Sequence, residues 1–272
     1  MDEELNGQGW NSTKVMFGKR VVTCDSWDGF TSFISQKLAD FDTYIFRGHA
    51  NENWKLEPTI DRLLSDKSRF KPNAKRRKEH LEKFKYATRG RRGSTPKADM
   101  SENDWWALGQ HHGLLTPLLD WSESPFVAAY FAYLSEDEVE HDGYIVVWAL
   151  SRSASERKNS FISISKKNNK TNNLDCIEFI RPLTDENQRL ISQRGLFTRA
   201  PDHLTIEDWI HNNFSEKKSN GACLLKILIP GHDRIKAMKS LNRMNVNHLS
   251  LFPDLDGASK HCNTTLMIQK YG

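Results

Sequence analysis

The stretch from Trp105 to Ala132 reads WWALGQHHGLLTPLLDWSESPFVAAYFA and sets a dense polar cluster between two apolar segments. The polar members are a glutamine, two histidines, an aspartate and a serine: Gln110, His111, His112, Asp120 and Ser122. Packing alone explains such a cluster poorly, because each buried polar group would need a hydrogen-bond partner. We therefore interpret it as the wall of a pocket, followed by a helix over 126–134 that opens at Pro125.

Upstream of this stretch, Tyr44–His49 reads YIFRGH. Its aromatic and β-branched residues predict a short buried strand that ends at Gly48, where the backbone can approach a ligand. A guanidinium binds phosphate through two hydrogen bonds, so Arg47 at this strand end points to an anionic ligand such as a nucleotide. His49 belongs to the same predicted ligand wall. The alternative for Arg47 is a structural ion pair with a carboxylate such as Asp120.

The chain has 272 residues with 38% hydrophobic and 10% aromatic content, which favours a folded globule with a sizeable core. No apolar run approaches the roughly eighteen residues of a membrane span, and the N-terminus lacks a signal-peptide pattern. We therefore expect a cytoplasmic protein without membrane contact. The four cysteines form no CxxC pair, which predicts neither a zinc motif nor structural disulfides: Cys24, Cys176, Cys223 and Cys262.

The net charge of +4 hides a strong asymmetry, because residues 66–97 hold 13 Lys or Arg residues against 3 Asp or Glu residues. Such a basic concentration steers a polyanion toward one face of a protein. We expect nucleic-acid contacts from four of its arginines: Arg76, Arg77, Arg91 and Arg92. The alternative is a solvated, lysine-rich face of the helix predicted over 75–88.

The pattern along the chain predicts a polar lead-in over residues 1–25, which ends in a strand at 19–23, and one domain over residues 26–272. Capping residues and helical spacing predict helices over 27–41, 58–64, 75–88, 101–111, 206–214 and 232–244. Apolar runs predict strands over 143–150, 176–180, 189–197 and 222–229. Residues 155–173 are predicted as a loop around a short strand, Leu249 as a further strand, and 254–260 as a closing turn. This order, with a helix-rich first half and a strand-rich second half, predicts a single α+β domain.

The polar cluster contains candidates for catalysis and ligand binding. His111 and His112 are adjacent and point in different directions, so they form no metal pair, and no metal site is expected. Asp120 stands between apolar residues and is expected to be half-buried, where it needs a donor. Ser122 lies at a predicted helix N-terminus, which favours anions, and an ordinary helix cap is its alternative role.

A second polar group stands near Gly195, where Gln193 is a further candidate for the site. Two carboxylates lie nearby in the sequence, Glu178 and Glu186, and either can stabilise a developing positive charge. A surface ion pair with an arginine is the alternative for both.

Together these residues resemble the FRG domain, which is named for the signature found here as Phe46-Arg47-Gly48. Three further blocks follow the family in order: 110–132, 187–197 and 251–257. Their most specific parts are Gln110-His-His-Gly113, Gln193-x-Gly195-x-Phe197 and Leu251-Phe-Pro-Asp-Leu-Asp-Gly257. One departure is Pro117, where the family more often has arginine. The resemblance covers most of the chain.

The block order is also similar to that of ADP-ribosyltransferases of the Arg-Ser-Glu type. In this comparison Arg47, the segment Ser122-Glu-Ser124 and Gln193 occupy the three signature places. The third place holds glutamine instead of the usual glutamate, so a neighbouring carboxylate would have to supply the charge.

This distant resemblance implies an ADP-ribosyltransferase-like fold and NAD as the substrate. Arg47 and Gly48 would hold its pyrophosphate or ribose, with Trp121 or Phe197 against the nicotinamide. A carboxylate or carbonyl oxygen would stabilise the positive charge that develops when the glycosidic bond breaks. The basic segment would hold the acceptor. FRG-like and ADP-ribosyltransferase-like proteins also occur as toxins in bacterial antiphage and toxin–antitoxin loci, which implies a neutralising partner protein, an antitoxin.

The leading expectation is an NAD-dependent ADP-ribosyltransferase that modifies nucleic acid, RNA before DNA, as a bacterial toxin. A second is a metal-independent nuclease that uses His112 and Asp120. A third is a module that binds a nucleotide or nucleic acid without catalysis, which the glutamine at position 193 favours.

Overall fold

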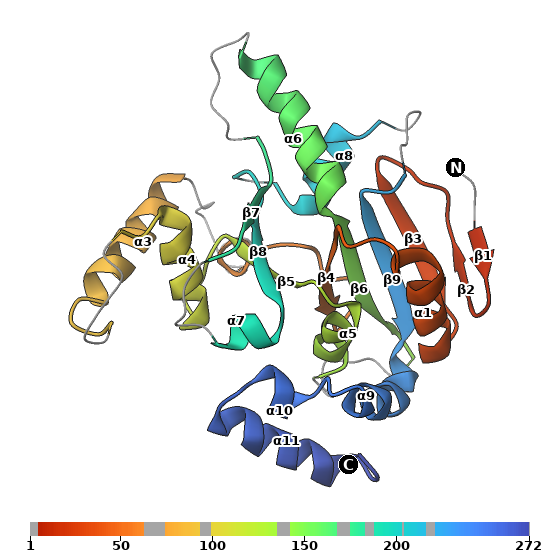
Figure 1. The fold of residues 1–272 in the computed structure, drawn as a ribbon. Coiled ribbons are helices and arrows are strands. Elements are labelled where there is room, and N and C mark those ends of the chain that lie inside the picture. Colours follow the sequence, from red (N-terminus) through yellow and green to blue (C-terminus); the bar gives the residue numbers. More distant parts are fainter. Residues whose placement is uncertain are drawn as a thin grey trace.

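One mixed sheet forms the centre of the computed structural model, which describes residues 5–62, 74–92, 99–134, 142–167, 175–182, 188–202, 204–215 and 221–271. In these ranges nine strands are hydrogen-bonded in the order β1-β2-β3-β9-β6-β4-β5-β8-β7 (Figure 1). Their bounds are β1 Leu5–Gly7, β2 Trp10–Ser12, β3 Lys19–Cys24, β4 Tyr44–His49, β5 Leu118–Ser122, β6 Tyr144–Ser151, β7 Glu178–Ile180, β8 Gly195–Arg199 and β9 Leu224–Pro230. β3 and β9 pair in parallel, and the other neighbours pair antiparallel.

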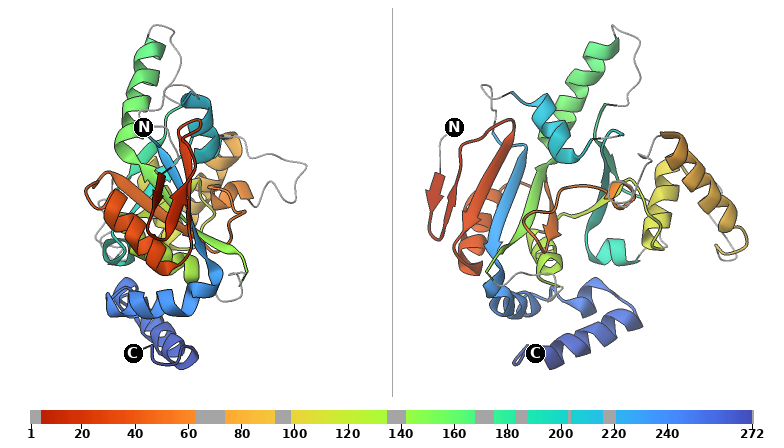
Figure 2. Two further views of the ribbon diagram at one scale, coloured as in Figure 1. Left: turned by 90° about the vertical axis from the view of Figure 1, so that its right-hand side faces the viewer. Right: turned by 180° about the vertical axis from the view of Figure 1, so that it is seen from behind.

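The helices surround this sheet (Figure 1 and Figure 2). They are α1 Trp27–Phe33, α3 Ala74–Ala87, α4 Glu102–His111, α5 Pro125–Tyr133, α6 Arg152–Lys167, α7 Gln188–Ser192, α8 Ile206–Asn213, α9 Arg234–Arg243, α10 His248–Leu251 and α11 Leu255–Met267. A π-helical turn over Ile34–Leu38 extends α1, and a 3-10 turn over Gly231–Asp233 precedes α9. Figure 1 shows α5, α7, α9, α10 and α11 at one end of the sheet, and α6 and α8 at the other. None of the helices in the described ranges is long and apolar enough to cross a membrane.

Residues 5–24, predicted as part of a lead-in with one strand, form the three strands β1, β2 and β3 of the central sheet. β2 pairs with β3, and β3 joins the rest of the sheet through its parallel pairing with β9. Trp10, Val22 and Cys24 are buried in the main core. The sheet therefore runs across the boundary predicted at residue 25. These strands lie at the opposite side of the molecule from α3 and α4 (Figure 2).

A mixed helix-and-sheet fold is confirmed, but the predicted order of its elements was wrong. Five strands, β1 to β5, end before residue 123, so strands and helices alternate through the first half of the chain. The first two strands escaped prediction because their sequences, LNG and WNS, are short and polar and carry almost no strand propensity.

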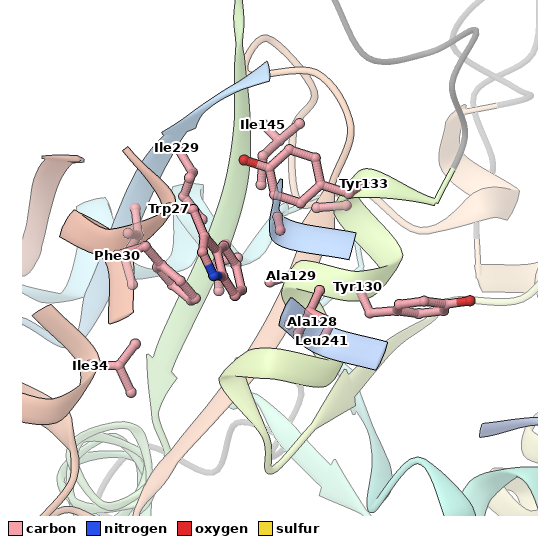
Figure 3. Close-up of a cluster of buried hydrophobic side chains, with 14 of the residues drawn as sticks. Trp27, Phe30, Ile34, Ala128, Ala129, Tyr130, Tyr133, Ile145, Ile229 and Leu241 are labelled. Carbon is pink, nitrogen blue, oxygen red and sulfur yellow. The ribbon is translucent and has the colours of Figure 1, made fainter. Parts of the chain in front are cut away.

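The main core lies between the sheet and the helices α1, α5 and α9, as Figure 3 shows. Trp27 and Phe30 of α1 pack with ring centroids 5.3 Å apart, and Tyr133 of α5 lies 6.4 Å from Trp27. The sequence of α5, PFVAAYFAY, is apolar on nearly every side, which is typical of a helix buried all round. Because α5 is buried, the turn that joins β5 to α5 is held in place. The polar cluster ends at this turn.

Two predicted elements of the middle region are corrected by the structure. Residues 155–167, predicted within a loop around a short strand, belong to the helix α6, because Ala154, Ser155 and Ile162 face the sheet at helical spacing. The strand predicted over 189–197 is a helix, α7, followed by β8, which begins at Gly195. Alternating polar and apolar residues in both segments resemble a strand over a short window.

The C-terminal predictions were also wrong. Leu249 lies in α10, and the closing turn predicted over 254–260 is the start of α11. Asp254 caps α11 by accepting from the N–H of Gly257 at 2.8 Å. A side chain at Gly257 would clash with the Phe252 carbonyl, so glycine permits the tight entry into this helix.

The sheet opens between β4 and β5, and this opening positions the site. The two strands share a single register pair, Phe46 with Ser122, whereas β4 continues beside β6 from Tyr44 to His49. Beyond the shared pair the strands diverge. Side chains from both strands and from α5 therefore reach the gap.

Candidate functional site

A cavity of about 410 Å³ lies at the gap between β4 and β5, and we call it the central cavity. Its walls come from β4, α4, β5, α5, α7, β8 and the residue that follows α10: Phe46, Arg47, Gly48, Gln110, His111, Asp120, Trp121, Ser122, Ala128, Phe131, Arg189, Leu190, Gln193, Phe197 and Phe252. The predicted pocket wall and the predicted Arg-Gly strand thus meet in one hollow.

Arg47 is a partly buried cation in this cavity, with a side chain 18% exposed. Its Nη1 donates to the main-chain carbonyl of Asp120 at 2.8 Å and lies 3.5 Å from the carboxylate of the same residue. If β4 and β5 continued to pair, Gly48 would stand opposite Asp120. Because the strands diverge there, the main-chain carbonyl of Asp120 has no partner on β4, and the guanidinium of Arg47 donates to it instead. Burial lowers the pKa of Arg47, yet a guanidinium stays protonated at neutral pH. Its described bonds use Nε and Nη1, so Nη2 is the nitrogen left for a ligand.

His49 positions Arg47 and is not a wall of the central cavity, which corrects its predicted role in ligand binding. The Nε2 atom of His49 accepts from Nε of Arg47 at 3.1 Å. The ring is 6% exposed, and burial, followed by the charge of Arg47, lowers the pKa of His49 to about 3. The imidazole is therefore neutral and fixes the guanidinium without adding charge.

Gly48 lines the cavity, but its missing side chain serves the packing of a helix. A Cβ at this position would clash with the carbonyl of Ala128 and would lie 2.8 Å from the N atom of Ala132. β4 and α5 can approach this closely only with glycine at the contact. Gly48 therefore makes room for α5, and its predicted contact with a ligand stays a prediction.

Asp120 brings a carboxylate to the cavity, with a side chain 62% exposed instead of half-buried as predicted. The prediction relied on its apolar neighbours, Leu119 and Trp121. Because side chains alternate along a strand, those two point to the opposite face of β5 and are buried there. Asp120 is left facing the gap and Arg47.

Ser122 and Gln193 line the cavity and are tied to each other. The Ser122 hydroxyl donates to the main-chain carbonyl of Gln193 at 2.7 Å and accepts from the N–H of Ser124 at 3.0 Å. The Gln193 amide donates to the carbonyl of Leu251 at 3.2 Å. Both side chains thus hold the wall together, and the predicted roles in ligand binding for Ser122 and in catalysis for Gln193 stay predictions.

The C-terminal end of α4 supplies Gln110 and His111 to the central cavity. The side-chain oxygen of Gln110 accepts from the buried hydroxyl of Thr116, which fixes the loop after α4. His112 caps α4 and lines a neighbouring groove instead. His111, and not the predicted His112, is therefore the histidine of this cavity, since successive residues at a helix end point in different directions.

Arg189 and Phe252 are wall residues that our sequence reasoning did not assign to the site. Arg189 of α7 donates through Nε and Nη2 to one carboxylate oxygen of Asp254, at 2.8 and 2.6 Å. Its guanidinium also lies 5.4 Å from the ring centroid of Phe252. These contacts join two of the blocks that carry the FRG resemblance. The presence of Arg189 and Phe252 in those blocks is the sequence signal that could have assigned them to the site.

Trp121 and Phe197, predicted to lie against a ligand ring, belong mainly to the core. The indole N–H of Trp121 donates to the Thr198 hydroxyl at 2.7 Å, and both aromatic side chains are 3% exposed. Phe131 and Phe252 are the partly exposed rings of the cavity, and they meet edge to face at 6.0 Å.

Glu178 lies away from the central cavity, so its predicted catalytic role was wrong. It stands on the edge strand β7 opposite Arg199, at the far end of β8 from Gly195, and accepts from Asn103 at 2.8 Å. Glu186 lies outside the described residues. Among the described residues there is no cluster of three or more His, Cys, Asp or Glu side chains that could hold a metal ion.

Arg77 of the basic segment is buried and structural, which overturns its predicted contact with nucleic acid. Its Nη1 donates to Asp202 at 2.8 Å and its Nη2 to Asp61 at 2.6 Å. The residue is 4% exposed, and its guanidinium connects α3 to two other segments of the chain.

The other three predicted arginines of the basic segment lie at or near the surface. Arg76 and Arg91 are exposed, and the Arg92 guanidinium lies 4.7 Å from the ring centroid of Trp105. For these three arginines a nucleic-acid contact stays a prediction. Residues 66–73 and 93–97 of this segment lie outside the described part of the chain.

Residues 42–141 match the family model of the FRG domain. Over these residues the match agrees with the resemblance to the FRG domain that the sequence implied. The matched region holds β4, α4, β5 and α5, and the remaining cavity walls come from beyond it. No curated protein and no solved structure gives a significant match to the chain.

Proposed function

We propose that this chain is an NAD-dependent ADP-ribosyltransferase that modifies nucleic acid, RNA before DNA. The observation that carries the proposal is the pair formed by Arg47 and Asp120 in the central cavity, a partly buried guanidinium beside an exposed carboxylate. The guanidinium suits a pyrophosphate, and the carboxylate suits the positive charge that develops on the ribose when a glycosidic bond breaks.

The volume and the lining residues of the central cavity suit a nucleotide substrate. A volume of about 410 Å³ falls within the range of about 300–1,000 Å³ typical of small-molecule sites. Arg47 offers positive charge, and the partly exposed rings of Phe131 and Phe252 offer apolar surface for a base. NAD would bring to this site an ADP-ribosyl group attached to nicotinamide as the leaving group.

The residues of this chain then have distinct tasks. Arg47 binds phosphate, and His49 holds the guanidinium in place through the 3.1 Å bond to its Nε. Asp120 takes the charge-stabilising role that the sequence reasoning gave to Glu178 or Glu186. Ser122 and Gln193 keep the turn after β5 in register with the segment after α7.

The nature of the acceptor rests on the charge around α3. Residues 74–92 hold nine Lys or Arg residues against two Glu residues, which favours a polyanion on this side of the molecule. From the family resemblance we further propose a bacterial toxin that acts in the cytoplasm, in antiphage defence or a toxin–antitoxin locus. Its activity would be held in check by a neutralising partner protein.

A second candidate is a nucleotide-binding module without catalysis. It is favoured because Ser122 and Gln193 are engaged in hydrogen bonds within the protein. Of the predicted catalytic residues that line the central cavity, Asp120 then has the open side chain. The nuclease alternative has less support, because His112 and Asp120 line different hollows.

The test is incubation with NAD labelled in its adenylate phosphate, together with total RNA, DNA and cell protein, followed by separation of the three fractions. We expect label in RNA. Asp120→Asn should lower the rate of ADP-ribosyl transfer about 100-fold, because loss of a charge-stabilising group has an effect of this size. The affinity for ADP should change less than threefold. Arg243→Ala, an exposed arginine on α9, is the matched control and should behave as the wild type.

Label on protein alone would keep the chemistry and discard the nucleic-acid acceptor. Unchanged transfer in Asp120→Asn would remove Asp120 from the chemistry. Binding of ADP without NAD turnover in any fraction would favour the module without catalysis.

A further inference from the structure

The central cavity adjoins a second hollow of about 390 Å³, which we call the histidine groove. The groove is lined by residues from the ends of α4 and α7 and from the segment after α10: His111, His112, Gln188, Arg189, Pro253 and Asp254. His111 and Arg189 line both hollows. These two side chains therefore stand at the boundary between the central cavity and the histidine groove.

The two hollows differ in chemistry. The central cavity has partly exposed aromatic rings beside cations, as a nucleotide site requires, whereas the walls of the groove are polar apart from Pro253. A hydroxyl or amino group would find hydrogen-bond partners in the groove, and a planar apolar ring would find little there to stack on. The groove therefore suits the second reactant of a transfer reaction.

Of the two boundary residues, Arg189 is committed to other partners. Two of its nitrogens donate to Asp254, and its guanidinium lies over Phe252. A guanidinium also holds its protons at any working pH. His111 is thus the boundary side chain that can exchange a proton.

The surroundings of His111 favour its neutral form. The ring of His112 lies 4.9 Å away at 70°, and the guanidinium of Arg189 and the carboxylate of Asp254 face it from α7 and from the start of α11. Burial, followed by His112 and Arg189, lowers the pKa of His111, and Asp254 opposes this shift. At neutral pH the imidazole therefore has a lone pair able to accept a proton.

We propose that the histidine groove admits the acceptor and that His111 takes the acceptor's proton where the two hollows meet. This inference rests on the proposed transferase function. In the step, a lone pair of the acceptor oxygen or nitrogen forms a bond to C1 of the nicotinamide-bearing ribose. The bond from that carbon to the nicotinamide nitrogen breaks, its electron pair leaves with neutral nicotinamide, and the acceptor's proton passes to His111.

His112 offers a matched control, because it is the next residue in the chain and lines the groove alone. The first measurement is NMR of the histidine ring signals, assigned with His111→Gln and His112→Gln. ADP should move the signals of His111 and leave those of His112 in place. An RNA oligonucleotide should move both. This readout does not depend on turnover.

The second measurement is the pH profile of transfer with labelled NAD and the same RNA. Wild-type transfer should rise with pH through the titration of His111. His111→Gln should lose this limb of the profile, with kcat about 100-fold lower and ADP affinity within about threefold. His112→Gln should keep the rise with pH, and the control Arg243→Ala on α9, away from both hollows, should keep the profile and a rate within about threefold of the wild type.

The outcomes separate the inference from the proposed function. Wild-type turnover with an unchanged pH profile in His111→Gln would overturn the inference alone, as would ADP that leaves the His111 signals in place. A wild type that turns over no NAD would overturn the proposed function. Movement of both histidines with a protein acceptor but not with RNA would overturn nucleic acid as the occupant of the groove.

Discussion

Arg47 and Arg77 are both largely buried, and their surroundings are opposite. Arg77 on α3 donates to two aspartates at 2.6 and 2.8 Å, so its charge is matched within the chain. Arg47 has a neutral histidine, a main-chain carbonyl and one exposed carboxylate 3.5 Å away, and it faces a cavity. The comparison teaches that the cavity proposed to bind a ligand is marked by an incompletely compensated buried cation, and that the most basic stretch of sequence is a poor guide to it.

The largest expected effect is on stability, at Arg77. Arg77→Ala would leave Asp61 and Asp202 partly buried without their cation, and we expect the free energy of unfolding to fall by about 3 kcal/mol or more. Urea unfolding followed by circular dichroism measures this. Lys78→Ala, at an exposed neighbouring position, should change it by less than about 0.5 kcal/mol. Equal stability of the two variants would show that Arg77 is a surface cation, which would break the comparison.

The second effect is on ligand binding, at Arg47. Arg47→Ala should weaken ADP binding about 100-fold, because a charge-assisted phosphate contact of about 2–3 kcal/mol is lost. Isothermal titration calorimetry with the wild type, Arg47→Ala and the control Arg243→Ala provides the measurement. ADP affinity that is the same in all three proteins would remove Arg47 from the site.

The third effect is a pH dependence that originates at His49. Its pKa in the folded protein, about 3, lies below the ordinary value of 6.5. Below pH 6.5 the unfolded chain therefore binds a proton that the folded chain does not, so stability is complete above this pH and falls as the pH decreases toward 3.

We expect His49 to account for about 2 kcal/mol of the stability lost between pH 7 and pH 5. In urea unfolding at both pH values, His49→Gln should lose about that much less than the wild type over this interval. Parallel losses in the two proteins would mean that His49 is protonated in the fold and does not accept from Arg47.

The smallest effect is expected at Ser122. Ser122→Ala removes the bond to the Gln193 carbonyl and should lower the free energy of unfolding by about 1 kcal/mol. ADP affinity should stay within about threefold, because the hydroxyl is bonded to the protein. A loss of ADP binding as large as that of Arg47→Ala would show that Ser122 contacts the ligand itself.

Much of the site was predictable from residue type and position. An arginine at a strand end and a polar cluster before an apolar helix indicated a shared pocket, and β4, β5 and α5 bring them together. The strongly apolar strands and helices, β6, β9 and α5, were likewise predictable, because their burial leaves little choice of structure.

The remaining features depend on long-range contacts that the local sequence does not contain. The exposure of Asp120 follows from strand alternation together with the parting of β4 and β5, and no local pattern indicates that parting. The two carboxylates that bury Arg77 come from Asp61 and Asp202 and meet it only in the fold. The helix α11 follows from a cap at Asp254 and a close approach at Gly257, in a segment whose periodicity is weak.

The most direct test of the central claim is a crystal structure of the protein with ADP. The account predicts the diphosphate in the central cavity, within hydrogen-bond distance of Arg47, with the base against Phe131 or Phe252. ADP bound along α3 and α4, or bound in the histidine groove with the Arg47 guanidinium untouched, would contradict it.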